Sequence, residues 1–238
     1  MSHPRSFITG STRGIGRAIA KAMLSSGGRV TITGRDGAGV DETVRQLAAE
    51  CGAGDRVGGQ VMDARDRASV DRAVAAAALA FGGLDVVVNN AGVGIYGDLE
   101  TVSDDDWRTV METNVTGPFQ VMRAAIPLLR EAGGGWIINI ASLAGAHPFA
   151  GGGAYCASKA ALIALTESAM QELRADNIRV SVVLPGSVAT KFSPRASGDD
   201  SWKLSPDDIA EVVVDLLRHP ARSLPSRVEI RPARPKKG

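Results

Sequence analysis

The chain alternates short apolar runs with longer stretches in which apolar residues recur every three or four positions. The second pattern is typical of amphipathic helices, whereas short runs bounded by turn residues are typical of strands. Strands are predicted at residues 6–9, 29–33, 57–62, 84–88, 136–141, 178–184 and 227–231. Helices are predicted at residues 15–24, 40–50, 68–80, 107–130, 155–174 and after Ser205. The continuously apolar run 84–88 indicates a strand that is buried on both faces.

Two of these helices begin with recognisable capping residues. Ser103 precedes three aspartates at 104–106, where a serine can cap the helix and carboxylates interact favourably with its dipole. Ser205 is followed by Pro206, and proline is favoured at the first position of a helix. Pro127 is expected to bend the long helix near its end.

This alternation of strands and helices predicts an α/β fold with a single doubly wound parallel sheet. We expect a Rossmann-like sheet of about seven strands with helices on both faces, forming one domain over residues 1–238. No linker or internal repeat interrupts the pattern. Ligands of such sheets bind at the carboxyl ends of the strands, near the point where the strand order reverses. Candidate chemistry is therefore sought directly after each strand.

Composition narrows the possible partners. Glycine accounts for 28 of the 238 residues, about 12% against an average of about 7%, and it occurs in clusters without the period of collagen. The chain has 27 basic and 26 acidic residues, a net charge of +1, which offers no field to attract nucleic acid or an anionic membrane. The basic end, with Arg231, Arg234, Lys236 and Lys237, reads as a solvated tail.

The cysteines and the N-terminus point to a cytoplasmic protein. Cys51 and Cys156 lack the spacing of metal ligands and make no disulfide framework, so no metal is expected. The N-terminal residues lack the apolar region of a signal peptide. The longest apolar run, residues 73–81, is about half the length that a membrane-spanning helix needs, so no membrane partner is expected.

The first glycine cluster lies between a predicted strand and a predicted helix and reads T-G-S-T-R-G-I-G. Glycines there permit a tight turn and close approach of the backbone to a ligand, and the helix N-terminus offers N–H groups to a pyrophosphate. The spacing differs from the usual G-x-G-x-x-G, but the strand–loop–helix context supports a dinucleotide site. The residues expected to bind the cofactor are Gly10, Ser11, Thr12, Arg13, Gly14, Ile15 and Gly16.

The end of the second predicted strand bears on the choice of nucleotide. An acidic residue at this position binds the ribose 2′-hydroxyl of NAD, but here the position falls on Gly34, followed by Arg35. Guanidinium groups of Arg13 and Arg35 suit a 2′-phosphate. Asp36 leaves the alternative open, because a small error in register would bring it to the ribose. We expect NADP(H) to be preferred over NAD(H).

Tyr155 and Lys159 are four residues apart on a predicted helix and therefore share one face. A phenol with a pKa of about 10 is a poor acid–base catalyst at neutral pH, and a nearby ammonium group lowers that pKa. Tyr155 would then exchange a proton with a carbonyl or alcohol oxygen. Ser142, after the fifth strand, would donate a hydrogen bond to the same oxygen.

These features occur in a fixed order with N-N-A-G at 89–92, Asn114 in the long helix and P-G-S-V-A-T at 185–190. Together they resemble the short-chain dehydrogenase/reductase family, in its shorter subfamily with T-G-x-x-x-G-x-G and Y-x-x-x-K. The resemblance covers nearly the whole chain. It implies hydride transfer between a nicotinamide, usually its pro-S hydrogen, and a small carbonyl or secondary alcohol. It also implies a homotetramer built on the helices 107–130 and 155–174.

The resemblance further assigns roles to single residues. Asn114 would hold a water that relays protons through Lys159, and Lys159 would also hold the nicotinamide ribose. Asp63 would face the adenine amino group, and Asn89 would line the cofactor or brace the sheet. The cofactor contacts implied after the later strands are Asp63, Asn89, Ala91, Gly92, Tyr155, Lys159, Pro185, Gly186, Val188 and Thr190.

The substrate stays open. Pocket walls are expected from Ile95, Tyr96, Leu143, His147 and Phe149. Lys191 and Arg195, on a short lid at 188–203, would meet an anionic substrate group or serve only as solvated charges. The alternatives are a 3-oxoacyl-carrier-protein reductase and a 3-hydroxy-acid or serine dehydrogenase, the latter closer to the chain ending at 230–235. A non-catalytic cofactor-binding sensor would require a broken Ser–Tyr–Lys set, and here that set is intact.

Overall fold

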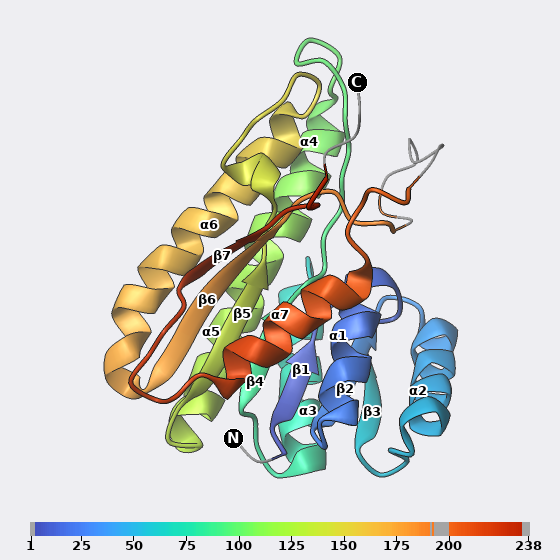
Figure 1. Cartoon of the computed structure of the whole chain (residues 1–238), viewed down its shortest axis with the longest axis vertical. Coiled ribbons are helices and arrows are strands. Elements are labelled where there is room, and N and C mark those ends of the chain that lie inside the picture. The colour runs from blue at the N-terminus through green and yellow to red at the C-terminus, as the bar shows by residue number, and fades with distance from the viewer. Residues whose placement is uncertain (1–2, 191, 193–199, 235–238) are drawn as a thin grey trace.

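The computed structural model describes residues 3–190, 192 and 200–234 of the chain (Figure 1). The strands are β1 (Arg5–Ile8), β2 (Arg29–Gly34), β3 (Val57–Val61), β4 (Val86–Asn89), β5 (Gly135–Ile140), β6 (Ile178–Pro185) and β7 (Arg227–Ile230). The α-helices are α1 (Gly14–Ser25), α2 (Gly37–Cys51), α3 (Arg67–Phe81), α4 (Asp104–Met111), α5 (Gly117–Glu131), α6 (Gly153–Leu173) and α7 (Pro206–Arg218). A π-helical turn (Glu112–Thr116) joins α4 to α5, and short 3-10 turns occupy Leu143–Gly145 and Arg174–Asp176.

All seven strands form one parallel sheet in the order β3-β2-β1-β4-β5-β6-β7. Ile8 of β1 pairs with Ile32 of β2 on one side and Val88 of β4 on the other. The chain first builds outward from β1 to β3 and then returns to β4, so the strand order reverses between β1 and β4. The predicted fold class is thereby confirmed.

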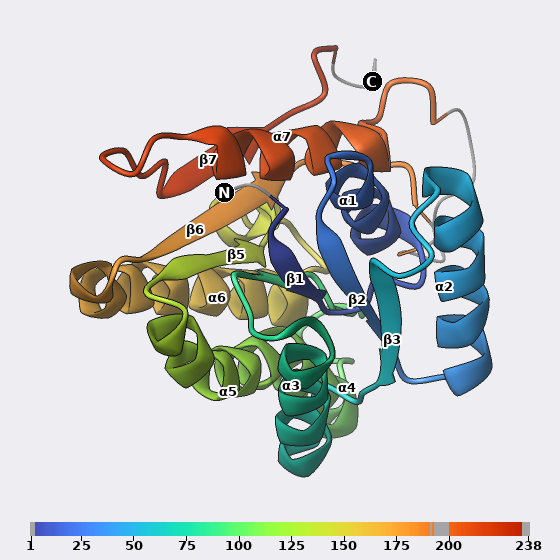
Figure 2. The same cartoon turned by 90° about the horizontal axis from the view of Figure 1, so that it is seen from below.

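Helices cover both faces of the sheet (Figure 2). Helices α1, α2 and α7 pack on one face, and α3, α5 and α6 pack on the other. Side chains of β4 alternate between the two cores, with Val86 and Val88 in one and Val87 in the other. Burial on both sides explains why this strand is apolar at every position.

The prediction of one long helix at 107–130 is wrong in one respect, because a π-helical turn divides this stretch into α4 and α5. Helix α4 begins at Asp104, and its cap is the predicted Ser103, whose Oγ accepts a hydrogen bond from the Asp106 N–H at 3.1 Å. The π-helical turn then separates α4 from α5. Such turns insert a residue into a helix and are frequent at functional sites; this one contains the buried Asn114.

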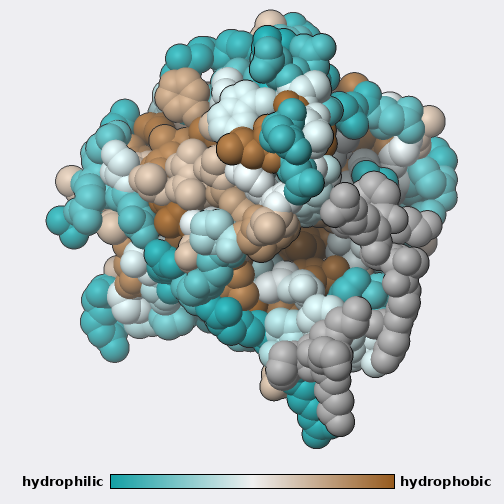
Figure 3. Space-filling view, turned by 90° about the horizontal axis from the view of Figure 1, so that it is seen from above, coloured by the Kyte–Doolittle hydropathy of each residue, from teal (hydrophilic) through white to brown (hydrophobic). Residues whose placement is uncertain are grey.

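Because the strands are parallel, the loops after β1, β4, β5 and β6 leave the sheet at the same edge. Figure 3 looks onto this edge, where apolar residues are visible inside a hollow near the middle of the face. None of the described helices is long and apolar enough to cross a membrane. Among the described residues, no three His, Cys, Asp or Glu side chains gather as metal ligands would.

Candidate active site

The glycine-rich loop after β1 has a backbone that only glycine adopts readily. Gly10 and Gly14 have φ angles of +62° and +56°, in the left-handed region. A Cβ atom at Gly10 would lie 2.9 Å from the Ala91 Cα, and one at Gly16 would lie 2.5 Å from the Asn90 Nδ2. The loop therefore packs so closely on the segment after β4 that side chains at these positions would collide.

The N-terminus of α1 differs from most other helix starts of the molecule. Its N-cap residue, Arg13, makes no side-chain capping hydrogen bond, and no acidic residue occupies the first turn. Side chains cap four other helices, namely α2 with Asp36, α3 with Asp66, α4 with Ser103 and α7 with Ser205. A helix start with no side-chain acceptor, behind a glycine-rich loop, fits a pyrophosphate.

The end of β2 carries free guanidinium groups and a carboxylate that is already engaged. Arg13 and Arg35 are exposed, and neither makes a hydrogen bond or ion pair with its side chain within the described part of the chain. Asp36 accepts a hydrogen bond from the Gly39 N–H at 3.0 Å and caps α2. At Gly34, a Cβ atom would lie 2.7 Å from the Thr12 Cγ2. The strand end thus has no room for an acidic side chain pointing in this direction.

Two residues expected to contact the cofactor have side chains that brace the sheet. Ser11 is fully buried; its Oγ donates to the Ile8 carbonyl and accepts from the Thr33 N–H, both at 2.8 Å. Asn89 is also buried, and its Nδ2 donates to the Asn139 Oδ1 at 2.8 Å. Bracing was one of the two roles expected of Asn89, whereas Ser11 was expected only to contact the cofactor.

Asp63, after β3, has a partner that the sequence analysis missed. The Arg65 guanidinium binds both of its carboxylate oxygens, at 3.1 Å from Nε and 2.7 Å from Nη2. Hydrogen bonds from Arg65 lower the pKa of Asp63, against the opposing effect of burial. The sequence does show Asp63 and Arg65 two residues apart after the third strand. Whether residues at that spacing form an ion pair depends on the conformation of the turn between them, which the sequence pattern does not show.

The segment after β4 is fixed to the glycine loop by Asn90, which the sequence analysis quoted in its motif without assigning a role. Its Nδ2 donates to the Thr9 and Gly10 carbonyls, both at 3.0 Å. The N–H groups of Asn90 and Ala91 both donate to the Thr9 Oγ1 at 2.9 Å. These bonds hold the two loops together at the point where the strand order reverses.

The segment after β6 reaches the same loop. The Thr190 Cγ2 lies 3.6 Å from the position that a Cβ of Gly14 would take. The start of this segment is fixed by β7, since the Gly186 N–H donates to the Ile230 carbonyl at 2.8 Å. Further along the segment, Val188 forms a parallel bridge with Leu204. Pro185 ends β6 and is buried. The predicted positions 185–190 therefore lie at the edge of the glycine loop.

Tyr155, Lys159 and Ser142 meet between α6 and the end of β5. Tyr155 and Lys159 are both buried on α6, and the Ser142 side chain lies close enough to the Tyr155 hydroxyl to lower its pKa. The Ser142 Oγ accepts a hydrogen bond from the Ala144 N–H at 3.1 Å. Lys159 donates from Nζ to the Ile140 carbonyl at 3.0 Å. A Cβ at Gly92 would lie 3.6 Å from the Lys159 Nζ, so the loop after β4 borders this group.

Asn114 ties the π-helical turn to the same group. Its Oδ1 accepts from the Val93 N–H at 2.8 Å, and its Nδ2 donates to the Val93 carbonyl at 2.9 Å. The same Nδ2 donates to the Ser158 Oγ at 3.0 Å, which in turn donates to the Tyr155 carbonyl at 2.7 Å. Asn114 therefore fixes the loop after β4 against α6.

Burial sets the proton affinities of this group. Burial raises the pKa of Tyr155 above its ordinary value of 10, whereas the Ser142 side chain lowers it. Burial also lowers the pKa of Lys159 to about 8. In the protein alone, burial therefore dominates the pKa of Tyr155. The Lys159 Nζ lies 5.8 Å from the Tyr155 ring centre, and its lowering of that pKa stays a prediction.

Of the residues predicted to form the pocket walls, some lie near the Tyr155 ring and others do not. Tyr96 and Phe192 have ring centres 5.5 Å and 5.9 Å from that of Tyr155, and Phe149 packs on Tyr96 at 6.0 Å. His147 is exposed, with its Nε2 3.0 Å from the Arg231 Nη2. Leu143 packs toward Gly186, and Ile95 is half-buried beside Tyr96. Lys191, Arg195, Lys236 and Lys237 lie outside the described residues.

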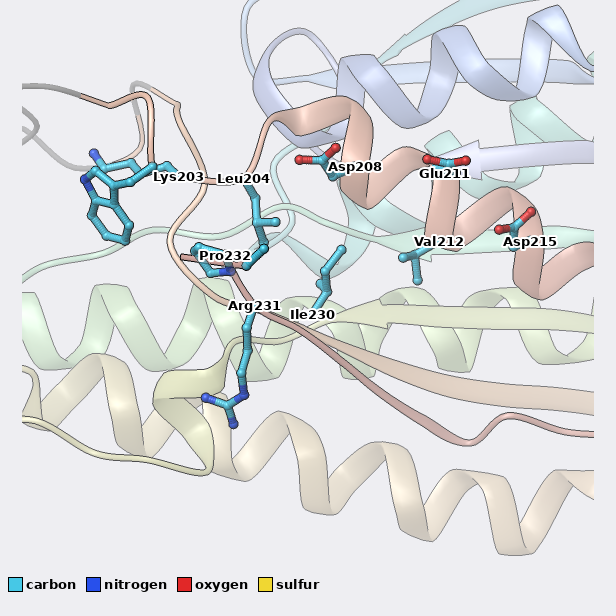
Figure 4. A pocket seen from close by; sticks show the side chains of 11 residues that line it. Lys203, Leu204, Asp208, Glu211, Val212, Asp215, Ile230, Arg231 and Pro232 are labelled. Carbon is cyan, nitrogen blue, oxygen red and sulfur yellow. The ribbon is translucent and has the colours of Figure 1, made fainter. Parts of the chain in front are cut away.

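A separate hollow of about 490 Å³ lies between α7 and the segment after β7 (Figure 4). Asp208, Glu211 and Asp215 line it from α7 (Figure 4). Ile230 and Pro232 border it from the chain end. None of Ser142, Tyr155 and Lys159 lines this hollow, so it is distinct from the site built by the strand ends.

Comparison with known proteins agrees with this geometry. A family model described as short chain dehydrogenase matches residues 5–200. An uncharacterized oxidoreductase of Staphylococcus aureus strain MW2 is 31% identical over 225 residues, covering 94% of this chain and 95% of that protein. Dehydrogenase/reductase SDR family member 4 of Oryctolagus cuniculus is 38% identical over 187 residues, covering 78% of this chain and 71% of that protein.

Solved structures match over almost the full length. An alcohol dehydrogenase from the archaeon Thermococcus sibiricus, complexed with 5-hydroxy-NADP, superposes with a TM-score of 0.89 at 30% identity, covering 98% of both chains. A metagenomic short-chain oxidoreductase in complex with NADP superposes with a TM-score of 0.84 at 36% identity, covering 98% of this chain and 99% of the other.

Proposed function

The chain belongs to the short-chain dehydrogenase/reductase family of NAD(P)-dependent oxidoreductases, and on that premise we propose that it transfers a hydride between NADP(H) and a small carbonyl or secondary alcohol. The observation that carries the proposal is the meeting of Ser142, Tyr155 and Lys159 beside the loop after β4, which itself packs on the glycine loop. A cofactor-binding sensor without catalysis would not need the hydroxyl groups of Ser142 and Tyr155 and the buried amine of Lys159 in one place.

The residues present fit a dinucleotide with a 2′-phosphate. Gly10 and Gly14 have positive φ angles, a Cβ at Gly10 would collide with the Ala91 backbone, and α1 begins without a side-chain cap. Arg13 and Arg35 are available for a phosphate, while Asp36 is engaged in capping α2. Both structures named above hold an NADP-type ligand, which supports the same preference.

The chemistry assigned to the site is proton transfer at an oxygen. Carbonyl reduction needs a hydride at carbon, which the bound nicotinamide supplies, and a proton at oxygen. The Tyr155 hydroxyl donates that proton, and the Ser142 hydroxyl donates a hydrogen bond to the same oxygen and stabilises its developing charge. Lys159 binds the end of β5 through the Ile140 carbonyl, and Asn114 ties the loop after β4 to α6. A water held by Asn114 would relay protons to Tyr155 through Lys159.

The proton affinities favour reduction at neutral pH. A buried Tyr155 whose pKa is raised keeps its proton at pH 7, which is the state that a general acid requires. Alcohol oxidation requires the phenolate instead and is therefore expected to speed up as the pH rises. The positive charge of an oxidised nicotinamide acts in the same direction as Lys159 and favours the phenolate.

The proposal includes a homotetramer in which residues 1–238 form one catalytic domain per subunit. The support is family resemblance together with exposed apolar residues on the relevant helices. Trp107 on α4 and Phe119 on α5 are 43% and 42% exposed. Helix α6 exposes small residues at Ala157, Ala160 and Ala164, which permit close packing of a second helix.

A panel of carbonyls and alcohols with NADPH, NADH and the oxidised cofactors tests the function, read at the absorbance band of the reduced nicotinamide. We expect carbonyl-dependent loss of NADPH absorbance at neutral pH, slower turnover with NADH, and alcohol-dependent gain at high pH. Absence of any carbonyl- or alcohol-dependent change, with either cofactor shown to bind, would contradict the proposal.

A further inference from the structure

A row of aromatic rings runs from the catalytic tyrosine to the surface; we call Phe149, Tyr96, Tyr155 and Phe192 the aromatic row. Tyr96 stands edge-on to Tyr155, with ring centres 5.5 Å apart and an interplanar angle of 61°. Phe192 lies on Tyr155 at 5.9 Å, and Phe149 lies on Tyr96 at 6.0 Å. Phe149 is 50% exposed and Phe192 39% exposed, so the row offers apolar ring surface at the mouth of the site.

Two glycines let the row assemble. A Cβ at Gly94 would lie 2.6 Å from the Phe192 Cε1 and 2.7 Å from the Tyr96 hydroxyl oxygen. A Cβ at Gly152 would lie 2.6 Å from the Phe149 Cε2. The two loops that carry these glycines are joined where the Gly97 N–H donates to the Gly151 carbonyl at 2.9 Å. The rings of Phe192 and Tyr96 therefore pack directly against the backbone of Gly94, and the ring of Phe149 packs against that of Gly152.

The same loops carry no cation for an anionic substrate. Segments 94–102 and 141–153 contain no lysine or arginine, but they contain Asp98 and Glu100, which are both exposed. Arg231 reaches this rim from the segment after β7, where Glu229 binds it at 2.8 Å and His147 lies at 3.0 Å. Within the described part of the chain, the mouth is thus apolar, with the acidic Asp98 and Glu100 at its edge and with Arg231 already paired with Glu229.

These observations concern the substrate that the proposed reaction would take, and they rest on that proposed function. We propose that the enzyme reduces neutral ketones or aldehydes that carry an aromatic ring next to the carbonyl group, and that Tyr96 and Phe149 hold this ring. Aromatic pairs favour edge-on and offset contacts beyond the burial of apolar area, and the row presents both edges and faces. Acidic side chains at the rim disfavour carboxylate and phosphate groups.

Two matched pairs of substrates test ring and charge separately. Acetophenone and cyclohexyl methyl ketone have similar size, but only the first is aromatic. Ethyl acetoacetate and acetoacetate share a 3-oxo group, but only the second is charged. We expect kcat/KM with NADPH to be about tenfold higher for acetophenone than for the cyclohexyl ketone, and higher for the ester than for the acid.

Variants assign the preference to the rings. Tyr96→Leu and Phe149→Leu should each reduce the acetophenone preference several-fold, whereas Tyr96→Phe, which keeps the ring, should retain it. Phe81→Leu is the control, because Phe81 is a half-buried aromatic residue at the end of α3, outside the row. NADPH binding, followed by fluorescence, should stay unchanged in all four variants and shows that they are folded.

The outcomes separate this inference from the function on which it rests. Equal kcat/KM for the two ketones, a preference that survives Tyr96→Leu and Phe149→Leu, or faster turnover of acetoacetate than of its ester would overturn the aromatic substrate alone. The last result would instead favour Lys191 or Arg195 as the partner of an anionic group. No turnover of any of the compounds, with NADPH bound, would overturn the proposed function as well.

Discussion

At the scale of single residues, the candidate site depends on polar groups that are buried with defined partners. Lys159 is the clearest case: its side chain is almost fully buried, yet its ammonium has one hydrogen-bond acceptor, the Ile140 carbonyl, at 3.0 Å. Burial of a charged group costs free energy unless it is fully paired. Burial of the Lys159 ammonium is therefore expected to reduce the free energy of unfolding, while it places a proton donor near Tyr155.

This cost predicts a pH dependence of stability. The pKa of Lys159 falls from 10.5 to about 8 on folding, so between these values the unfolded chain binds more protons than the folded chain. The free energy of unfolding should therefore rise with pH from about 8 toward 10, by up to about 3 kcal/mol. Above pH 10, Tyr155 acts in the opposite direction, because its raised pKa makes the folded chain the one that retains a proton.

Urea unfolding at several pH values between 7 and 10 measures this effect. Lys159→Met should be more stable than the wild type at pH 7 and should lose that advantage as the pH rises. Lys21→Met, at an exposed position of α1, is the control and should follow the wild-type curve. Parallel curves for the wild type and Lys159→Met would show that Lys159 is not desolvated as described.

Cofactor preference also belongs to this scale. Arg35→Ala removes an exposed guanidinium that makes no hydrogen bond or ion pair within the described residues, and it should weaken NADPH binding at least about tenfold, the contribution expected of a charge-assisted hydrogen bond. NADH binding should hardly change. Isothermal titration with both cofactors checks this, with Arg45→Ala on α2 as a control. Equal losses for the two cofactors would contradict the assignment of a 2′-phosphate.

Sequence reasoning reached most residues of the site, because the chemistry constrains their identity and spacing. It could not show that Asp36 caps α2 or that Arg65 binds Asp63, since both depend on local backbone geometry within two or three residues. It also could not determine the sign of the Tyr155 pKa shift. That sign depends on how much water the folded chain excludes, which a pattern of residues does not show.

At the scale of elements, the π-helical turn between α4 and α5 is the feature with the most direct bearing on the site. It contains Asn114, which bonds both polar groups of the Val93 backbone and the Ser158 hydroxyl. The sequence showed one long amphipathic stretch, because a single extra residue in a turn hardly disturbs apolar periodicity. The parallel sheet and the caps at Ser103 and Ser205, in contrast, followed from pattern and capping chemistry.

Removal of the Asn114 side chain should therefore affect both stability and turnover. Asn114→Ala leaves the Val93 N–H and carbonyl without their partners, and we expect it to reduce the free energy of unfolding by about 2 kcal/mol. Turnover should fall more than NADPH affinity, because Asn114 no longer links α6 to the loop that follows β4. Thr116→Ala, an exposed position in the same turn, is the control. Unchanged turnover in Asn114→Ala would contradict the role of this tie.

At the scale of the whole molecule, one parallel sheet brings every candidate residue to one edge. The reversal of strand order between β1 and β4 places the glycine loop beside the segment after β4. The end of β5 and helix α6 follow directly. This arrangement could be predicted from the alternation of elements alone. The seating of rings on Gly94 and Gly152 could not, because it depends on how two loops meet in space.

The same scale includes assembly. We expect a homotetramer of about 100 kDa, about four times the 24.7 kDa chain, following the association expected of closed symmetric oligomers. Ala160→Arg on the exposed face of α6 should dissociate it, because a long charged side chain prevents close helix packing. Sedimentation velocity at micromolar concentration distinguishes the species. A wild-type monomer under these conditions would contradict the tetramer.

The central claim is that Tyr155 exchanges the proton while a nicotinamide of NADP(H) exchanges the hydride. The most direct test is to measure NADPH binding and carbonyl-dependent NADPH oxidation side by side in the wild type and in Tyr155→Phe, which removes only the hydroxyl. The account predicts that the variant binds NADPH as the wild type does but turns over at least about 100-fold more slowly. Wild-type turnover in Tyr155→Phe would contradict it.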